Sequence, residues 1–122
     1  MGLKVLIVDD DFINRKLLQT LLKKNPTVSD MVEAENGSEA LDKLKNDEEI
    51  NIVLLDIMMP IVDGVEFLKI FRADMANAHI PVIVLSTDDT RKAEVFDHGA
   101  NDFLRKPVRE DVLSSTMAQW TE

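Results

Sequence analysis

Short apolar runs alternate along the chain with longer segments whose apolar residues follow a helical spacing. Near-continuous apolar runs occupy residues 3–8, 51–55 and 82–85, and weaker runs occupy residues 30–34 and 101–104. Runs of this length and composition are typical of strands buried on both faces of a parallel sheet. The pattern therefore predicts five parallel strands.

The segments between these runs predict helices at residues 12–24, 36–46, 63–71, 90–98 and 109–120. In the first helix the residues at helical spacing are Ile13, Leu17, Leu18, Leu21 and Leu22, and in the third we expect Val65, Leu68, Ile70 and Phe71 to point inward. Asn36 and Asp63 each stand three residues before a glutamate, which is typical of a helix start. Gly99 is the expected stop of the fourth helix.

Strands that alternate with helices are typical of an α/β domain with a mostly parallel sheet. Right-handed connections place such helices on both faces of the sheet, which gives a doubly wound fold. No linker or low-complexity stretch interrupts residues 1–122, so we expect a single domain. The chain ends just after the last predicted helix, as a stand-alone protein or an amino-terminal domain would.

Polar residues of different kinds follow four of the predicted strands. Asp9, Asp10 and Asp11 follow the first strand, and the others are followed by Asp56, by Ser86 and by Lys106, in that order. The carboxyl ends of parallel strands meet along one edge, where open α/β sheets bind their ligands. We therefore expect a carboxylate cluster, a hydroxyl and an ammonium to lie close together.

The adjacent carboxylates favour a divalent cation. Asp11 is well placed to cap the helix that follows, but capping does not account for Asp9 and Asp10. Two carboxylates at a buried strand end repel each other unless a cation compensates them, and Mg²⁺ is commonly held by one or two carboxylates and phosphate oxygens. A third carboxylate, Asp56, is a candidate nucleophile toward phosphorus.

Composition narrows the possible partners. The net charge of −9 argues against a surface for duplex nucleic acid, since such surfaces need many Lys and Arg residues. The chain contains no cysteine, which excludes disulfides and thiolate metal sites and is compatible with the cytoplasm. No apolar run approaches the length of a membrane span, so we expect no membrane partner.

The strand-end residues belong to a set of motifs that resembles the receiver domain of two-component response regulators, the fold of chemotaxis regulators. The motifs are Val8-Asp9-Asp10, Asp56 to Pro60, Asp63-Gly64, Ser86, Gly99-Ala100 and Lys106-Pro107, and the resemblance runs from Lys4 to the last helix. It implies a flavodoxin-like fold with five helices and five strands in the order 2-1-3-4-5.

By this resemblance Asp56 is the phosphoacceptor, and Ser86 and Lys106 contact the phosphoryl oxygens. The implied ligands of Mg²⁺ are Asp10, Asp56 and the main-chain carbonyl of Met58, with Asp9 assisting through water.

Three further positions match the family. Phe103 occupies the position of an aromatic switch, whose ring turns inward as the hydroxyl moves toward the phosphate. Met58 and Asp88 occupy the positions that flank the attacking water during dephosphorylation.

The resemblance implies a signalling protein and not a turnover enzyme. A sensor histidine kinase or a histidine phosphotransfer protein would donate the phosphoryl group in a Mg²⁺-dependent reaction. The phosphorylated form would then change the face offered to a downstream output domain or protein, or to a second copy in a homodimer.

Two other functions remain open at this point. A receiver-shaped interaction module could act without phosphorylation, although it would not need the full set of Asp9, Asp10, Asp56, Ser86 and Lys106. A small phosphohydrolase could use Asp9 as nucleophile with Asp11 two residues on, but the chain leaves no room for a cap domain. A nucleotide- or flavin-binding domain is excluded because no glycine-rich loop follows the first strand.

Overall fold

A computed structural model describes residues 2–57 and 63–121. Within them, five strands form one sheet in the order β2-β1-β3-β4-β5, and every pairing is parallel. The strands are β1 (Leu3–Val8), β2 (Val28–Ala34), β3 (Ile52–Asp56), β4 (Val82–Ser86) and β5 (Asp102–Arg105). The predicted parallel sheet and the strand order implied by the resemblance are both confirmed.

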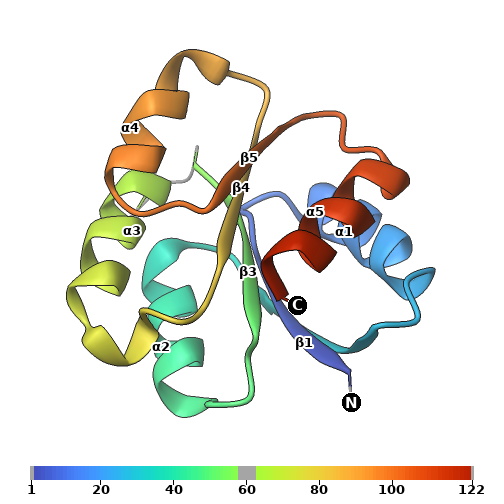
Figure 1. The fold of residues 1–122 in the computed structure, drawn as a ribbon, viewed down its shortest axis with the longest axis horizontal. Helices are drawn as coiled ribbons and strands as arrows, with labels where there is room; N and C mark the ends of the chain where they lie inside the picture. The colour runs from blue at the N-terminus through green and yellow to red at the C-terminus, as the bar shows by residue number, and fades with distance from the viewer. Residues whose placement is uncertain (1, 58–62, 122) are drawn as a thin grey trace.

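Helices cover both faces of the sheet. They are α1 (Phe12–Lys23), α2 (Gly37–Asn46), α3 (Gly64–Ala73), α4 (Lys92–Asp97) and α5 (Glu110–Thr121), with short 3₁₀ turns η1 (Met75–Asn77) and η2 (Asp89–Arg91). Figure 1 shows α2, α3 and α4 on one side of the sheet and α1 with α5 on the other. In the part of the chain described, no helix is long and apolar enough to cross a membrane.

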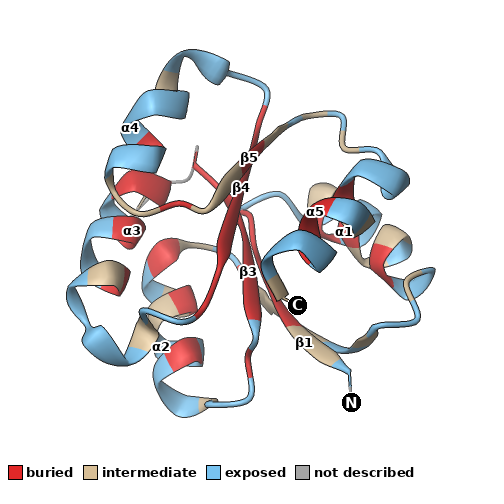
Figure 2. Cartoon of the chain, in the orientation of Figure 1, coloured by how far each residue is buried: buried red, intermediate tan, exposed pale blue. Residues whose placement is uncertain are grey.

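The sheet divides the interior into two apolar cores. Successive strand side chains point to opposite faces, so in β1 Leu6 and Val8 pack toward α2 and α3. Val5 and Ile7 instead join the core beneath α1 and α5. Figure 2 shows the central strands buried along most of their length, as expected for strands covered on both faces.

The helix starts agree with the capping residues read from the sequence. The side chain of Asn36 accepts a hydrogen bond from the amide of Glu39 at 2.8 Å, and Asp63 accepts one from the amide of Glu66 at 2.9 Å. Gly99, with φ of 101°, ends the turn after α4, a conformation that glycine adopts most readily.

Most boundaries lie within one or two residues of expectation, and two differences are informative. β2 begins at Val28, two residues before the expected start at residue 30. Its sequence shows little apolar alternation because it is an edge strand that pairs only with β1, so its start was hard to predict. The fourth helix, expected over residues 90–98, is divided into the 3₁₀ turn η2 and a shorter α4.

Apolar spacing misplaced several helical side chains. Ile70 was expected to point inward but is 49% exposed, and Phe67 is buried instead. The buried residues of α3 run through positions 64, 65, 67, 68 and 71, and Ile70 lies just outside that arc of the helix. In α1, Ile13 and Leu17 are 61% and 60% exposed.

Candidate functional site

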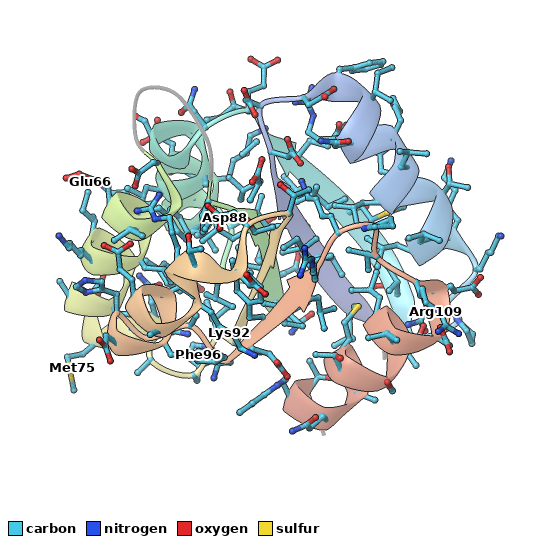
Figure 3. The ribbon with its side chains drawn as sticks, turned by 90° about the horizontal axis from the view of Figure 1, so that it is seen from above. Glu66, Met75, Asp88, Lys92, Phe96 and Arg109 are labelled. Atoms are coloured by element: carbon cyan, nitrogen blue, oxygen red, sulfur yellow. The ribbon has the colours of Figure 1, made fainter. Side chains whose placement is uncertain are left out.

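The carboxyl ends of four strands meet at one edge of the sheet, as the sequence predicts. Val8 pairs in register with Leu55, Asp56 with Leu85, and Ser86 with Arg105. Figure 3 shows this edge from above, with Asp88 in the loop after β4 and Arg109 across the sheet at the approach to α5. The polar residues that follow these strands are therefore neighbours in space.

Three carboxylates gather at this edge. Oxygen atoms of Asp9, Asp10 and Asp56 lie within 4.8 Å of one another. Asp9 is 1% exposed and Asp56 8%, whereas Asp10 is exposed. Taking two carboxylates out of water beside a third is costly unless cations compensate them.

Lys106 supplies part of that compensation. Its Nζ lies 3.3 Å from Oδ2 of Asp9 and 3.8 Å from Oδ2 of Asp56. One ammonium balances only one of the three carboxylates. The remaining negative charge and the all-oxygen donor set are suited to Mg²⁺, so the residues present fit such an ion.

Asp9 is held from several directions. Its amide donates to the carbonyl of Ala34 at 3.1 Å, and its Oδ1 accepts from the amide of Asp11 at 2.9 Å. Its own carbonyl accepts from Nη1 of Arg15 at 2.7 Å. Asp11 caps α1 by accepting from the amide of Ile13 at 2.8 Å, so its expected capping role is confirmed.

Ser86 is buried and its hydroxyl is engaged in the following loop. Oγ donates to the carbonyl of Asp88 at 3.2 Å and accepts from the amide of the same residue at 3.0 Å. The carboxylate of Asp88 in turn accepts from the hydroxyl and the amide of Thr90, at 2.6 and 2.9 Å. These two hydrogen bonds from Thr90 hold the pKa of Asp88 below its ordinary value, and the one from the hydroxyl contributes most.

Phe103 lies inward, in the core beneath α3 and α4, and is 8% exposed. The ammonium of Lys92 lies 5.9 Å from the centroid of its ring, within cation–π range. Figure 3 shows Lys92 and Phe96 extending from the same side of α4. The candidate switch residue is thus connected to the surface of α4.

A groove of about 750 Å³ opens beside the carboxylates. Asp56, Ser86 and Lys106 lie at its polar end, and Leu17, Leu21, Pro107 and Val108 are among its apolar lining. Leu17 is 60% exposed, and Ile13, one helical turn before it, is exposed as well. A molecule that reaches Asp56 can therefore rest on an apolar wall.

Arg15 is a residue of this region that sequence reasoning passed over. It lies on the buried side of α1 with Leu18 and Leu22 and donates to the carbonyl of Asp9. The sequence did contain a signal, because Arg15 stands at helical spacing from Leu18 and Leu22, where an apolar residue is expected. Met58, expected to offer its carbonyl to Mg²⁺, lies outside the described residues.

The two histidines and the one tryptophan of the chain are not part of the acidic cluster. His79 is exposed, and His98 follows α4 at its end. Trp120 donates from Nε1 to Oδ2 of Asp102 at 3.0 Å, which joins the end of α5 to β5.

Comparison with known proteins identifies the family to which this chain belongs. The family model of the response regulator receiver domain matches residues 5–118. A chemotaxis protein CheY homolog of Campylobacter jejuni is 32% identical, over 94% of this chain and 89% of its own length. Chemotaxis protein CheY4 of Vibrio cholerae has a similar structure, with a TM-score of 0.87, 28% identity and coverage of 98% of both chains.

Other relatives are much longer. The hybrid signal transduction histidine kinase E of Dictyostelium discoideum is 36% identical over 94% of this chain, which spans only 7% of that protein. The match over nearly all of this chain, together with the shared fold, shows that it belongs to the response regulator receiver domain family of two-component signalling.

Proposed function

We propose that this receiver domain accepts a phosphoryl group on Asp56 from a phosphohistidine donor, in a Mg²⁺-dependent reaction. The observation that carries the proposal is the cluster of three carboxylates with Lys106 beside it and Ser86 on the neighbouring strand. Residues 1–122 would act as one such domain, in signalling and not in turnover.

In the proposed transfer, a carboxylate oxygen of Asp56 attacks phosphorus. The new bond joins that oxygen to phosphorus, the bond from phosphorus to the donor imidazole breaks, and the imidazole nitrogen keeps the electron pair. The ammonium of Lys106, 3.8 Å from Asp56, and the hydroxyl of Ser86, in the same groove, would stabilise charge on the phosphoryl oxygens. Burial of Asp56 limits access of bulk water to the reacting atoms.

The ion would be held by Asp10 and Asp56, with Asp9 assisting and the carbonyl of Met58 as a further proposed ligand. Bound there, Mg²⁺ supplies positive charge that offsets repulsion between the incoming phosphate and the carboxylates.

The donor would contact the exposed face of α1. Any protein that brings a phosphohistidine to Asp56 must cover the rim of the site, and the adjoining groove is lined by Leu17 and Leu21 of α1. Ile13, 61% exposed and one helical turn before Leu17, extends this apolar face. A sensor histidine kinase or a histidine phosphotransfer protein with a matching apolar helix is the proposed partner.

Output would begin at Ser86. A phosphoryl group on Asp56 competes for the hydroxyl that is now bonded to the main chain of Asp88. Its movement would release the loop and η2, and the surface near Lys92 and Phe103 would change. An output domain, a separate protein or a second copy would read that surface.

Phosphorylation of Asp56 can be tested with a small donor. Incubation with MgCl₂ and acetyl phosphate is expected to add one phosphoryl group to the intact mass, and Asp56→Asn is expected to prevent it. A chain that stays unmodified, or a modification that survives in Asp56→Asn, would instead favour an interaction module that acts without phosphate.

The donor surface is tested with the same chemistry. Leu17→Glu is expected to slow transfer from purified histidine kinases of the source organism, because a charge interrupts the apolar face. Phosphorylation by acetyl phosphate needs no such face and should keep the parent rate. Equal slowing with both donors would contradict the docking assignment and point to damage at the site itself.

A further inference from the structure

Arg15 occupies a position of α1 that its neighbours in the helix fill with leucine. It lies three residues before Leu18 and seven before Leu22, and its side chain is 7% exposed. Arginine is seldom buried to this degree unless its charge is paired and its N–H groups have acceptors. The partners of Arg15 therefore show what its burial achieves.

Two of those partners join α1 to the sheet. Nε donates to Oε1 of Glu33 on β2 at 2.9 Å, and Nη1 donates to the carbonyl of Asp9 at 2.7 Å. Burial raises the pKa of Glu33, but hydrogen bonds from Arg15 and Gln19 outweigh it and leave that pKa below its ordinary value. Glu33 thus stays ionised near neutral pH and orients the guanidinium toward Asp9.

The carbonyl that Arg15 holds belongs to the peptide unit between Asp9 and Asp10. Because a peptide unit is planar, fixing its carbonyl fixes the plane from which both residues continue. The amide of Asp9 is fixed on its other side by Ala34. Mg²⁺ tolerates little departure from octahedral geometry, so the relative direction of these two carboxylates matters for its binding.

We propose that Arg15 is a positioning residue for the divalent-cation site, acting through the Asp9–Asp10 peptide and not as a ligand. The inference rests on the Mg²⁺ site of the proposed function. Loss of groups that orient metal ligands typically weakens metal binding by about 10- to 100-fold. The effect should appear in Mg²⁺ binding alone, with no phosphoryl donor present.

The test is a titration of the unphosphorylated protein with MgCl₂, followed through the NMR signal of the Asp11 amide. Arg15→Lys keeps the positive charge but cannot hold Glu33 and the Asp9 carbonyl in one planar fork. We expect its Kd for Mg²⁺ to rise about 10-fold.

Arg72→Lys is the matched control. Arg72 of α3 also donates to main-chain carbonyls, those of Gly99 at 3.0 Å and Asn77 at 2.8 Å, but has no bond to the acidic cluster. This variant should lose stability to urea and keep the parent Kd. Equal weakening of Mg²⁺ binding in both variants would indicate general loosening and overturn the inference.

If Arg15→Lys does not fold, Glu33→Ala tests the same inference. The side chain of Glu33 is 35% exposed, and its loss removes the partner of Nε while Nη2 of Arg15 still lies 3.8 Å from Oε1 of Glu35. This variant should also raise the Kd for Mg²⁺. If the variants at Arg15 and Glu33 that fold keep the Kd of the parent, the inference is overturned. If the parent binds no Mg²⁺, or Asp10→Ala binds it equally well, the proposed metal site itself fails.

Discussion

At the scale of single residues, Lys106 has two partners that a bound cation would share. Its ammonium lies 3.3 Å from a carboxylate oxygen of Asp9 and 3.8 Å from one of Asp56. Without the ion, Lys106 is the cation that offsets their repulsion. With the proposed ion bound, the same ammonium would lie close to a second positive charge. Lys106 should therefore oppose Mg²⁺ binding while it assists phosphoryl transfer.

Lys106→Met separates these two effects. Removing one positive charge at about 4 Å changes the energy of a cation in the site by about 1 kcal/mol per unit charge at the dielectric of water. For a divalent ion this is about 2 kcal/mol, so we expect Mg²⁺ to bind up to about 30-fold more tightly, as measured by titration, and phosphorylation by acetyl phosphate at saturating Mg²⁺ to become slower. A variant that loses both properties would show that Lys106 mainly maintains the local structure.

At the scale of elements, α1 has one face in the core and another in water, although both are apolar. Leu18 is 6% exposed and lies in the core beneath α1 and α5, whereas its neighbour Leu17 is 60% exposed. A buried leucine loses transfer energy and leaves a cavity when it is shortened, but an exposed one loses little.

Adjacent alanine variants test this division of α1. Leu18→Ala should lower the free energy of unfolding by about 2–5 kcal/mol, and Leu17→Ala should change it by less than about 0.5 kcal/mol. Urea denaturation of the two variants measures both values. Similar losses would mean that α1 packs with a different face toward the sheet.

How much of each element can be read from the sequence depends on the kind of information it needs. The starts of α2 and α3 could be predicted because Asn36 and Asp63 act within their own first turns. The exposure of Leu17 and Ile70 could not, since spacing gives the width of an apolar face but not which part of it meets the sheet. Arg15 was missed for a related reason: its partner Glu33 lies on β2, and its partner Asp9 follows β1.

The strand-end cluster itself was predictable because it follows from topology. Once strands are parallel, residues that follow them share an edge, and this brought Asp9, Asp56 and Lys106 together. The hydrogen bonds of Ser86 to the main chain of Asp88 depend on the conformation of a loop, which the strand topology does not determine.

At the scale of the whole molecule, ion pairs join elements near both ends of β1, from β1 itself at Lys4 and between α1 and β2 at Arg15 and Glu33. Lys4 pairs with Asp47 at the amino end, and near the carboxyl end Arg15 pairs with Glu33. The hydrogen bond from Lys4, together with one from the Glu49 amide, holds the pKa of Asp47 below its ordinary value, as Arg15 and Gln19 do for Glu33 despite its burial. Both carboxyls thus bind protons less readily in the folded chain than in the unfolded one.

Acid should therefore destabilise the fold partly through Glu33. A lowered native pKa contributes stability above the ordinary glutamate value of about 4.3, and this contribution is lost as pH falls through the native pKa. Glu33→Gln should lower the urea midpoint at pH 7 and make it fall less steeply below about pH 4.3. Glu48→Gln, at an exposed position after α2, is the control and should follow the parent curve. A parent-like acid profile in Glu33→Gln would show that its pairing with Arg15 adds nothing to stability, and would leave the hold on Asp9 as the remaining role of that arginine.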